Sequence, residues 1–272
     1  MSWQAQATYP EKQEYLAAGN YVDGWTSPLP PATPRRRSNE SSAAGSDYDA
    51  ELKGMLTTSS SQAKALDVYH TKSHTNMRIH DQAGNCIYYV DNSTFSIGKP
   101  DVTLLAGSEK NGQVLGVCRW SNMYSKHFNV GIGDPSTNEK GTIWEEVRTE
   151  SMIHPEYKWS LTLPSGARHS FAWLRIHGSD VKAEDKSANS ASNKNFKLID
   201  YEDPGRATLA VFASNRYKSW NKLGKFSMKV DGRERGWGDQ WEITVLLSAL
   251  GLVEMSRRRA RSRRSQGGSY GG

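Results

Sequence analysis

The segment DQWEITVLLSALGLVEMSRRRARSRR, residues 239–264, carries the strongest structural signal in this chain. Asp239, followed three residues later by Glu242, forms an N-terminal helix-capping signature. Eight of the eleven residues from Ile243 to Val253 are apolar. The segment therefore predicts a hydrophobic helix that begins at residue 239 and is followed by a cluster of arginines.

This helix can be buried on every side. With about 100° between successive residues, the apolar side chains cover most of its circumference. The positions between them hold Thr244, Ser248 and Gly251, which are small and uncharged, and the two hydroxyls can bond to carbonyls one turn back. An amphipathic surface helix would instead present a charged face. Burial of its seven large apolar side chains, at about 2 kcal/mol each, would stabilise the fold by on the order of 14 kcal/mol. The loss of conformational entropy has still to be subtracted from this gross value.

Burial in protein is favoured over insertion into a bilayer. Eleven residues reach about 16 Å along a helix, whereas the hydrocarbon core is about 30 Å thick. Glu242 and Glu254 stand at the two ends of the apolar run, so lengthening it would place carboxylates in the membrane. We therefore predict no transmembrane segment.

The chain before the helix is rich in short β-type runs separated by turn signals. One polar stretch, 178–195, is predicted to be a mobile hairpin loop, and 214–224 a loop or helical turn. The predicted strands are 66–70, 76–80, 86–91, 101–106, 113–120, 127–132, 142–149, 157–163, 168–177, 196–202, 206–213 and 225–230.

These elements predict an all-β fold with one central helix, an antiparallel closed β-barrel of about twelve strands around the C-terminal helix. A barrel of that size is too wide for strand side chains alone to fill, and the helix requires burial on all sides. We expect a disordered, low-complexity N-terminal arm over 1–60, the barrel over 66–256 with its helix at 239–256, and a disordered Arg-rich tail over 257–272.

Four stretches carry a resemblance to a known family: Ile87–Val90 (IYYV), Lys99–Leu104 (KPDVTL), Gly116–Trp120 (GVCRW) and the helix from Trp241 to Arg259. Over about 66–260 the chain resembles the tubby C-terminal-like superfamily, which includes LURP-one-related proteins and phospholipid scramblases, and within it uncharacterised fungal proteins. The resemblance implies a twelve-stranded barrel around a central helix. It also implies binding of phosphoinositide headgroups through basic surface residues, although no individual pocket position is matched here. The scramblase-like cysteine cluster is absent, which argues against palmitoylation and scrambling.

No motif for catalysis stands out in the sequence. Signatures of serine hydrolases, zinc proteases, P-loops, dinucleotide-binding loops and EF-hands are missing. His70 and His74 are four residues apart, but a strand end does not make such a pair converge on a metal. Cys86 and Cys118 are the only cysteines and form no CxxC motif, which suits a reduced compartment. We expect an intracellular protein that is not an enzyme and holds no metal or cofactor.

Positive charge is concentrated at the end of the helix. The formal net charge of the chain is +6. The whole surplus is accounted for by Arg257, Arg258, Arg259, Arg261, Arg263 and Arg264. These arginines are candidates for binding anionic lipid headgroups or another polyanion, since each contributes about 1 kcal/mol near an anionic surface. A solvated helix end is the simpler interpretation, because cations are favourable at a helix C-terminus.

The functional hypothesis is a non-enzymatic adaptor or binding module, cytoplasmic or peripheral to a membrane, that meets anionic lipid through this tail. The alternative is a nuclear or nucleic-acid-associated protein that uses the same arginines. Ser262 and Ser265 follow basic residues and are candidate kinase sites, where each phosphate would partly cancel the charge. The sequence leaves protein partners open.

Overall fold

The computed structural model describes residues 64–93, 98–122, 125–150, 156–184, 186, 189–190, 192, 194–215 and 219–267. The predicted N-terminal arm, 1–60, lies outside the described residues.

Twelve antiparallel strands form a closed barrel, as the sequence predicts. All twelve predicted strands are present, with bounds that differ by a few residues. They are β1 (Ala65–His70), β2 (Met77–His80), β3 (Cys86–Asn92), β4 (Val102–Ala106), β5 (Val114–Arg119), β6 (Phe128–Ile132), β7 (Ile143–Thr149), β8 (Glu156–Thr162), β9 (Arg168–Arg175), β10 (Phe196–Asp200), β11 (Thr208–Ser214) and β12 (Lys222–Met228).

Strands that follow one another in sequence are neighbours in the barrel, and β1 closes it by pairing with β12. The connections therefore alternate between the two ends. Lys64, just before β1, forms an ion pair of 3.0 Å with Glu242, at the start of the C-terminal helix α3 (Asp239–Gly267). Arg257, far along α3, contacts the β1–β2 turn. We call the barrel end that holds the connections after β1, β3, β5, β7, β9 and β11 the helix-exit end.

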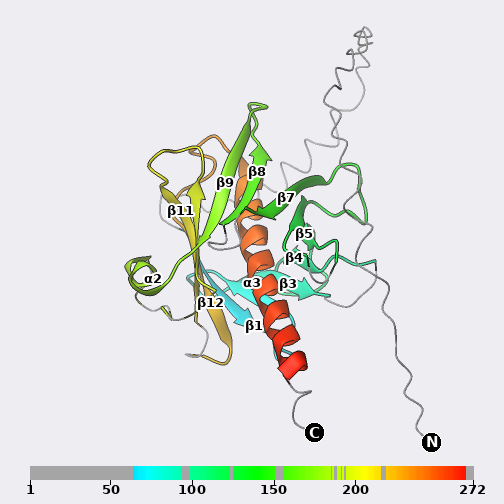
Figure 1. Cartoon of the computed structure of the whole chain (residues 1–272). Helices are drawn as coiled ribbons and strands as arrows, with labels where there is room; N and C mark the ends of the chain where they lie inside the picture. Colours follow the sequence, from blue (N-terminus) through cyan, green and yellow to red (C-terminus); the bar gives the residue numbers. More distant parts are fainter. Residues whose placement is uncertain are drawn as a thin grey trace, which may run out of the picture. The chain divides into compact units, whose positions relative to one another are not determined.

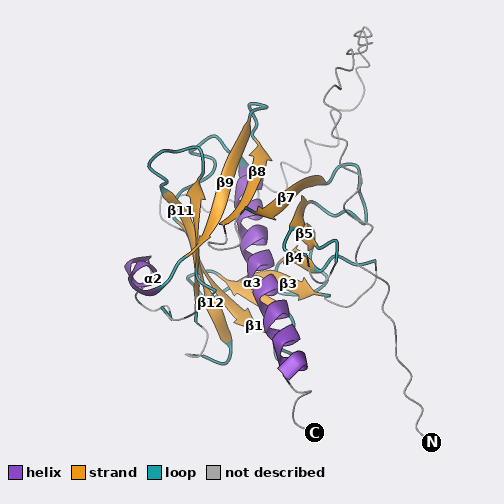
Figure 2. Ribbon diagram, in the orientation of Figure 1, coloured by secondary structure: helices purple, strands orange, loops and turns teal. Residues whose placement is uncertain are grey.

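Helix α3 runs through the barrel and forms the centre of its core (Figures 1 and 2). Every residue from Ile243 to Met255 is buried, and Leu247 and Val253 have no exposed surface. The helix is therefore the buried plug that its apolar circumference predicts.

The small polar residues of α3 behave as predicted. The Thr244 hydroxyl donates to the Gln240 carbonyl at 2.8 Å, and the Ser248 hydroxyl donates to the Val245 carbonyl at 3.0 Å. Ser248 also accepts the Trp173 indole N–H at 2.9 Å. Each buried hydroxyl is thus hydrogen-bonded, which removes the cost of burying it unpaired.

Two glycines let the helix approach the barrel wall closely. A Cβ at Gly251 of α3 would lie 2.3 Å from a ring carbon of Phe128 on β6. A Cβ at Gly116 on β5 would lie 2.6 Å from the Leu247 side chain. Strand and helix meet here at distances that only the absence of a side chain allows.

Two predictions about the loops need correction. Part of the predicted hairpin loop 178–195 is a short helix, α2 (Gly178–Glu184). Its Val181 packs with Ile176, Val211 and Ala213 in a small cluster separate from the main core. A single large apolar residue has no periodicity in sequence, so only the tertiary contact reveals this helix. The second correction concerns 214–224, where the connection between β11 and β12 is shorter than predicted because β12 already begins at Lys222.

The predicted end of the central helix at residue 256 is wrong. Helix α3 continues to Gly267, so residues 257–267 are helical rather than disordered, and 268–272 lie outside the described residues. Arginine is a good helix former, and cations near a helix C-terminus are stabilised by the helix dipole. Ion pairs with Glu254, one turn and two turns back, add to this stabilisation.

Candidate polyanion-binding end of the barrel

The arginine cluster begins where α3 leaves the barrel, and three of its members converge on a buried carboxylate. The Glu254 side chain is 1% exposed. Its oxygens lie 3.3 Å from Arg257 Nη1, 3.5 Å from Arg258 Nε and 2.6 Å from Arg261 Nη2. Positions three, four and seven residues apart share one helix face, so this convergence follows from helix geometry. A carboxylate can be buried here because it is paired with these cations.

Arg258 seals the helix against the barrel wall. Its guanidinium lies 2.6 Å from Asp101 Oδ1 and 4.2 Å from the centre of the Trp120 ring, and its side chain is only 10% exposed. Asp101 in turn accepts the Trp120 backbone N–H at 2.9 Å. A cation held by two carboxylates and an aromatic face is strongly fixed, so Arg258 is a structural residue.

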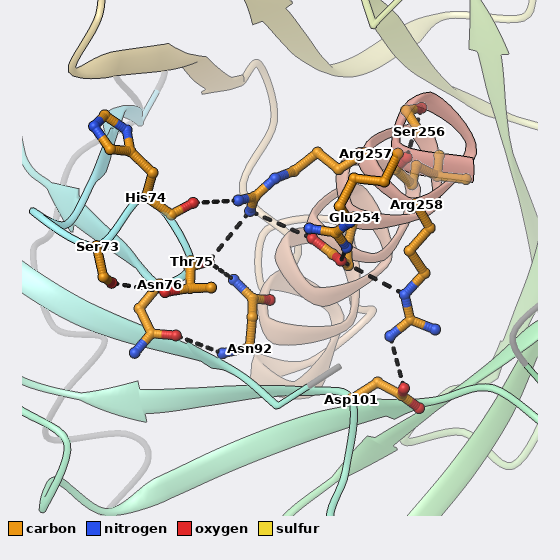
Figure 3. Close-up of polar contacts among 12 residues, drawn as sticks. Ser73, His74, Thr75, Asn76, Asn92, Asp101, Glu254, Ser256, Arg257 and Arg258 are labelled. Carbon is orange, nitrogen blue, oxygen red and sulfur yellow. Dashed lines mark hydrogen bonds and ion pairs between the residues drawn. The ribbon is translucent and has the colours of Figure 1, made fainter. Parts of the chain in front are cut away.

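Arg257 holds the β1–β2 turn. Its guanidinium donates to the carbonyls of His74 and Thr75, the second at 3.3 Å (Figure 3). The Thr75 carbonyl also accepts the Asn92 side-chain amide at 2.7 Å, and the Asn92 backbone N–H donates to Asn76 at 2.9 Å. The turn, the end of β3 and the helix are therefore tied together at the helix-exit end.

The cationic surroundings of Arg257 affect His70, at the end of β1. Burial, followed by the positive charges of Arg257, His74 and Lys194, lowers the pKa of His70 to about 4. The His70 and His74 rings lie 5.4 Å apart between centres. The nearby positive charges make protonation of His70 less favourable than burial alone would.

The structure thus separates the six predicted arginines. Arg257, Arg258 and Arg261 make intramolecular ion pairs, a role that the sequence did not predict. Arg259 lies on a different helix face and contacts Met255 Sδ at 3.4 Å. Arg263 and Arg264 lie on the helix, and their side chains are outside the described part of the structure. Polyanion binding by any of the six stays a prediction.

The fold adds basic residues that sequence reasoning missed. Lys72, Lys99 and Lys126 are exposed on the connections after β1, β3 and β5, all at the helix-exit end. They are far apart in sequence and meet only because alternate connections share a barrel end. A lysine in each of the connections after β1, β3 and β5 was the available signal, and it becomes meaningful once the strand order is known.

Charge is distributed differently at the two ends. The helix-exit end also carries acidic residues, including Glu150, but the arginines and lysines outnumber them. At the opposite end the exposed charges are mixed, because Glu109 neighbours Lys110 and Glu139 neighbours Lys140. Among the described residues, the basic surplus therefore lies at one end of the barrel.

Other polar clusters show no evident chemistry. At the opposite end, His169 places Nε2 2.8 Å from Asp200 and Nδ1 3.3 Å from Glu202, so both ring nitrogens face carboxylates and neither is free as a general base. Within the described residues, no group of three or more His, Cys, Asp or Glu side chains is arranged to hold a metal ion. Burial raises the pKa of the Cys118 thiol far above its usual range, as expected for a core residue.

Comparison with known proteins adds little beyond the fold. No family model matches the chain, and no curated protein matches it. The barrel is similar to the X-ray structure of AT5G01750 from Arabidopsis thaliana, with 16% sequence identity and a TM-score of 0.40, over 71% of this chain and 93% of that one. A structural similarity this weak supports no argument about function. Among the helices described, none combines the length and apolar character needed to cross a bilayer.

Proposed function

We propose that this protein is a non-enzymatic binding module whose helix-exit end attaches reversibly to an anionic membrane surface inside the cell. Phosphoinositide headgroups, with their dense negative charge, are the proposed preferred ligands. The chain would be a member of the tubby C-terminal-like superfamily, of the fungal type. Support for this membership comes from the four sequence stretches that resemble the family and from the helix-filled barrel of twelve strands.

One observation carries the proposal: the arginine-rich end of α3 leaves the barrel at the end where Lys72, Lys99 and Lys126 are exposed. These lysines, together with Arg259, Arg263 and Arg264, contribute six positive charges to this end of the protein. At about 1 kcal/mol each, six charges give about 6 kcal/mol, or a dissociation constant of roughly tens of micromolar. Attachment of this strength is reversible and sensitive to salt.

The helix end is suited to electrostatic contact rather than insertion. From Ser256 to Gly267, Ala260 is the only residue with an apolar side chain. An interfacial amphipathic helix would need a broad apolar face to enter the acyl region. The arginines are therefore expected to remain at the level of the headgroups.

The test uses the full chain with vesicles of phosphatidylcholine alone, with phosphatidylserine added, and with a phosphoinositide added, at low and high salt. The triple variant Arg259→Gln, Arg263→Gln, Arg264→Gln should bind anionic vesicles at least about tenfold more weakly, since three charges are lost. It keeps Arg257, Arg258 and Arg261, so the ion pairs of Glu254 are preserved. A chain truncated before residue 257 would remove those pairs and confuse folding with binding.

The matched control removes three charges from the opposite end with Lys110→Gln, Lys140→Gln and Arg235→Gln, which are exposed. It should bind like the unmodified chain. Failure of the full chain to bind any anionic vesicle at low salt would overturn the proposal. Retention on duplex DNA or single-stranded RNA in that case would support the nucleic-acid alternative.

A further inference from the structure

Trp220 is the most exposed large hydrophobic residue of the described chain, with 91% of its surface exposed. The next two, Ile143 and Tyr201, are 38% and 37% exposed. The other described tryptophans are buried or half-buried in the barrel. A lone indole so fully in water has no role in packing, and large exposed apolar side chains are typical of contact sites.

The backbone around Trp220 is well fixed. The Ser219 hydroxyl oxygen accepts the backbone N–H groups of Asn221 at 3.3 Å and Lys222 at 3.0 Å. The Asn221 carbonyl accepts the His70 N–H at 2.7 Å. Since β12 begins at Lys222, Trp220 stands on a short turn attached directly to the barrel wall. The turn therefore presents the indole from a defined position.

This turn lies at the helix-exit end, beside the arginine cluster. His70, which holds the Trp220 turn, ends β1, and the β1–β2 turn that follows is held by Arg257 of α3. Exposed Lys72 lies on that same β1–β2 turn. The Trp220 turn and Arg257 of α3 are thus both attached to one continuous stretch of chain, the end of β1 and the turn that follows it, at the same end of the barrel.

We propose that Trp220 is an interfacial anchor, which inserts its indole between the headgroups and acyl chains of the anionic membrane that the arginines and lysines approach. This inference rests on the proposed function and adds a contact of a different chemical kind. The indole has an apolar body and one N–H donor, which is why tryptophan is enriched at membrane–water interfaces. The surrounding charges select an anionic surface, and Trp220 requires that surface to have an apolar layer.

The experiment compares Trp220→Ser with the unmodified chain on phosphatidylcholine vesicles containing phosphatidylserine and a phosphoinositide, and on heparin. Heparin is a polyanion without an apolar layer. Trp220→Ser should weaken vesicle binding about tenfold, the loss expected for a partly buried large side chain, and should leave heparin binding unchanged. Tyr201→Ser, an exposed aromatic at the opposite end, is the matched control and should bind vesicles normally.

A spectroscopic measurement separates insertion from mere proximity. The fluorescence difference between the unmodified chain and Trp220→Phe isolates the emission of Trp220. On vesicles this difference should shift to shorter wavelength and be quenched by lipids with brominated acyl chains.

The inference is overturned if Trp220→Ser binds vesicles as tightly as the unmodified chain, or if it weakens heparin and vesicle binding equally. If Trp220→Ser binds vesicles normally but the triple arginine variant loses binding, the proposed function stands and only the anchor is refuted. Absence of vesicle binding by the unmodified chain would refute both.

Discussion

At the scale of single residues, the interior of the barrel is specified by shape as much as by hydrophobicity. Leu247 has no exposed surface, and a Cβ on Gly116 would stand only 2.6 Å from its side chain. The Cys118 thiol approaches the Leu247 carbonyl at 3.4 Å. The barrel wall and the helix are complementary in shape at this point, so a substitution in either one alters the packing of the other.

A charge at residue 247 should be severely destabilising. Leu247→Asp places a carboxylate among apolar side chains with no cation beside it, and we expect a loss of at least about 4 kcal/mol in the free energy of unfolding. Urea denaturation followed by circular dichroism measures it. Leu247→Met, which conserves volume, should cost less than about 1.5 kcal/mol. Near-normal stability of Leu247→Asp would contradict the central position of the helix.

His70 should make stability depend on pH. Its pKa is about 4 in the folded protein, against 6.5 for an ordinary histidine, so it stays neutral in the fold and takes up a proton on unfolding. Below the unfolded pKa the unfolded state binds more protons, so stability falls as pH drops from about 6.5 to about 4. After allowance for solvent screening of this half-buried ring, the loss is on the order of 1–2 kcal/mol.

Urea denaturation at several pH values between 4 and 7 measures this loss. His70→Gln cannot titrate and should flatten the curve over the window. A curve of the same slope in His70→Gln would assign the pH dependence to other groups.

At the scale of elements, α3 has two functions along one continuous helix. From Trp241 to Met255 it fills the barrel, and from Arg257 onward it extends beyond the core. Glu254 marks the change, because the arginines that follow fold back onto it. This separates the three arginines that pair with Glu254 from Arg259, which contacts Met255 instead.

Arg258 and Arg259 should differ sharply despite being neighbours. Arg258→Ala leaves Asp101 and the buried Glu254 with one cation fewer, and we expect a loss of about 3 kcal/mol. Arg259→Ala removes a contact with Met255 only and should stay within about 0.5 kcal/mol. Thermal unfolding compares the two. Equal effects would show that the ion pairs at the helix-exit end do not stabilise the barrel.

Elements with strong local patterns were predictable, and those that depend on distant contacts were not. Strands such as β3 and β8 alternate between buried and partly exposed residues, which matches the alternation in their sequences. Helix α2 escaped prediction because its buried residue Val181 packs on β11, a contact with a strand distant in sequence. The helical state of residues 257–267 was missed because Arg-rich sequence is typical of disorder as well as of helix ends.

At the scale of the whole molecule, the barrel and its helix form one cooperative unit. Trp159 and Trp173 on the wall and Trp241 on the helix belong to the same buried cluster. Neither wall nor helix can bury its apolar surface without the other.

The barrel should therefore unfold in a single transition. Tryptophan fluorescence, which reports on the core, and far-ultraviolet circular dichroism, which reports on the strands and helix, should give the same urea midpoint. Leu247→Met should shift both curves together. Separate midpoints would mean that the barrel wall persists without α3.

What the sequence determined by itself was the twelve strands and the need for a helix buried on all sides, because both follow from local periodicity. Only the tertiary structure decided which arginines pair with buried or half-buried carboxylates. Helix geometry and barrel closure bring Glu254 and Asp101 to Arg258, and strand alternation brings Lys72 and Trp220 to the end where α3 emerges. The contact between Asp101 and Arg258 joins residues more than a hundred positions apart and leaves no local trace in the sequence, and burial of Glu254 depends on the barrel that surrounds the helix.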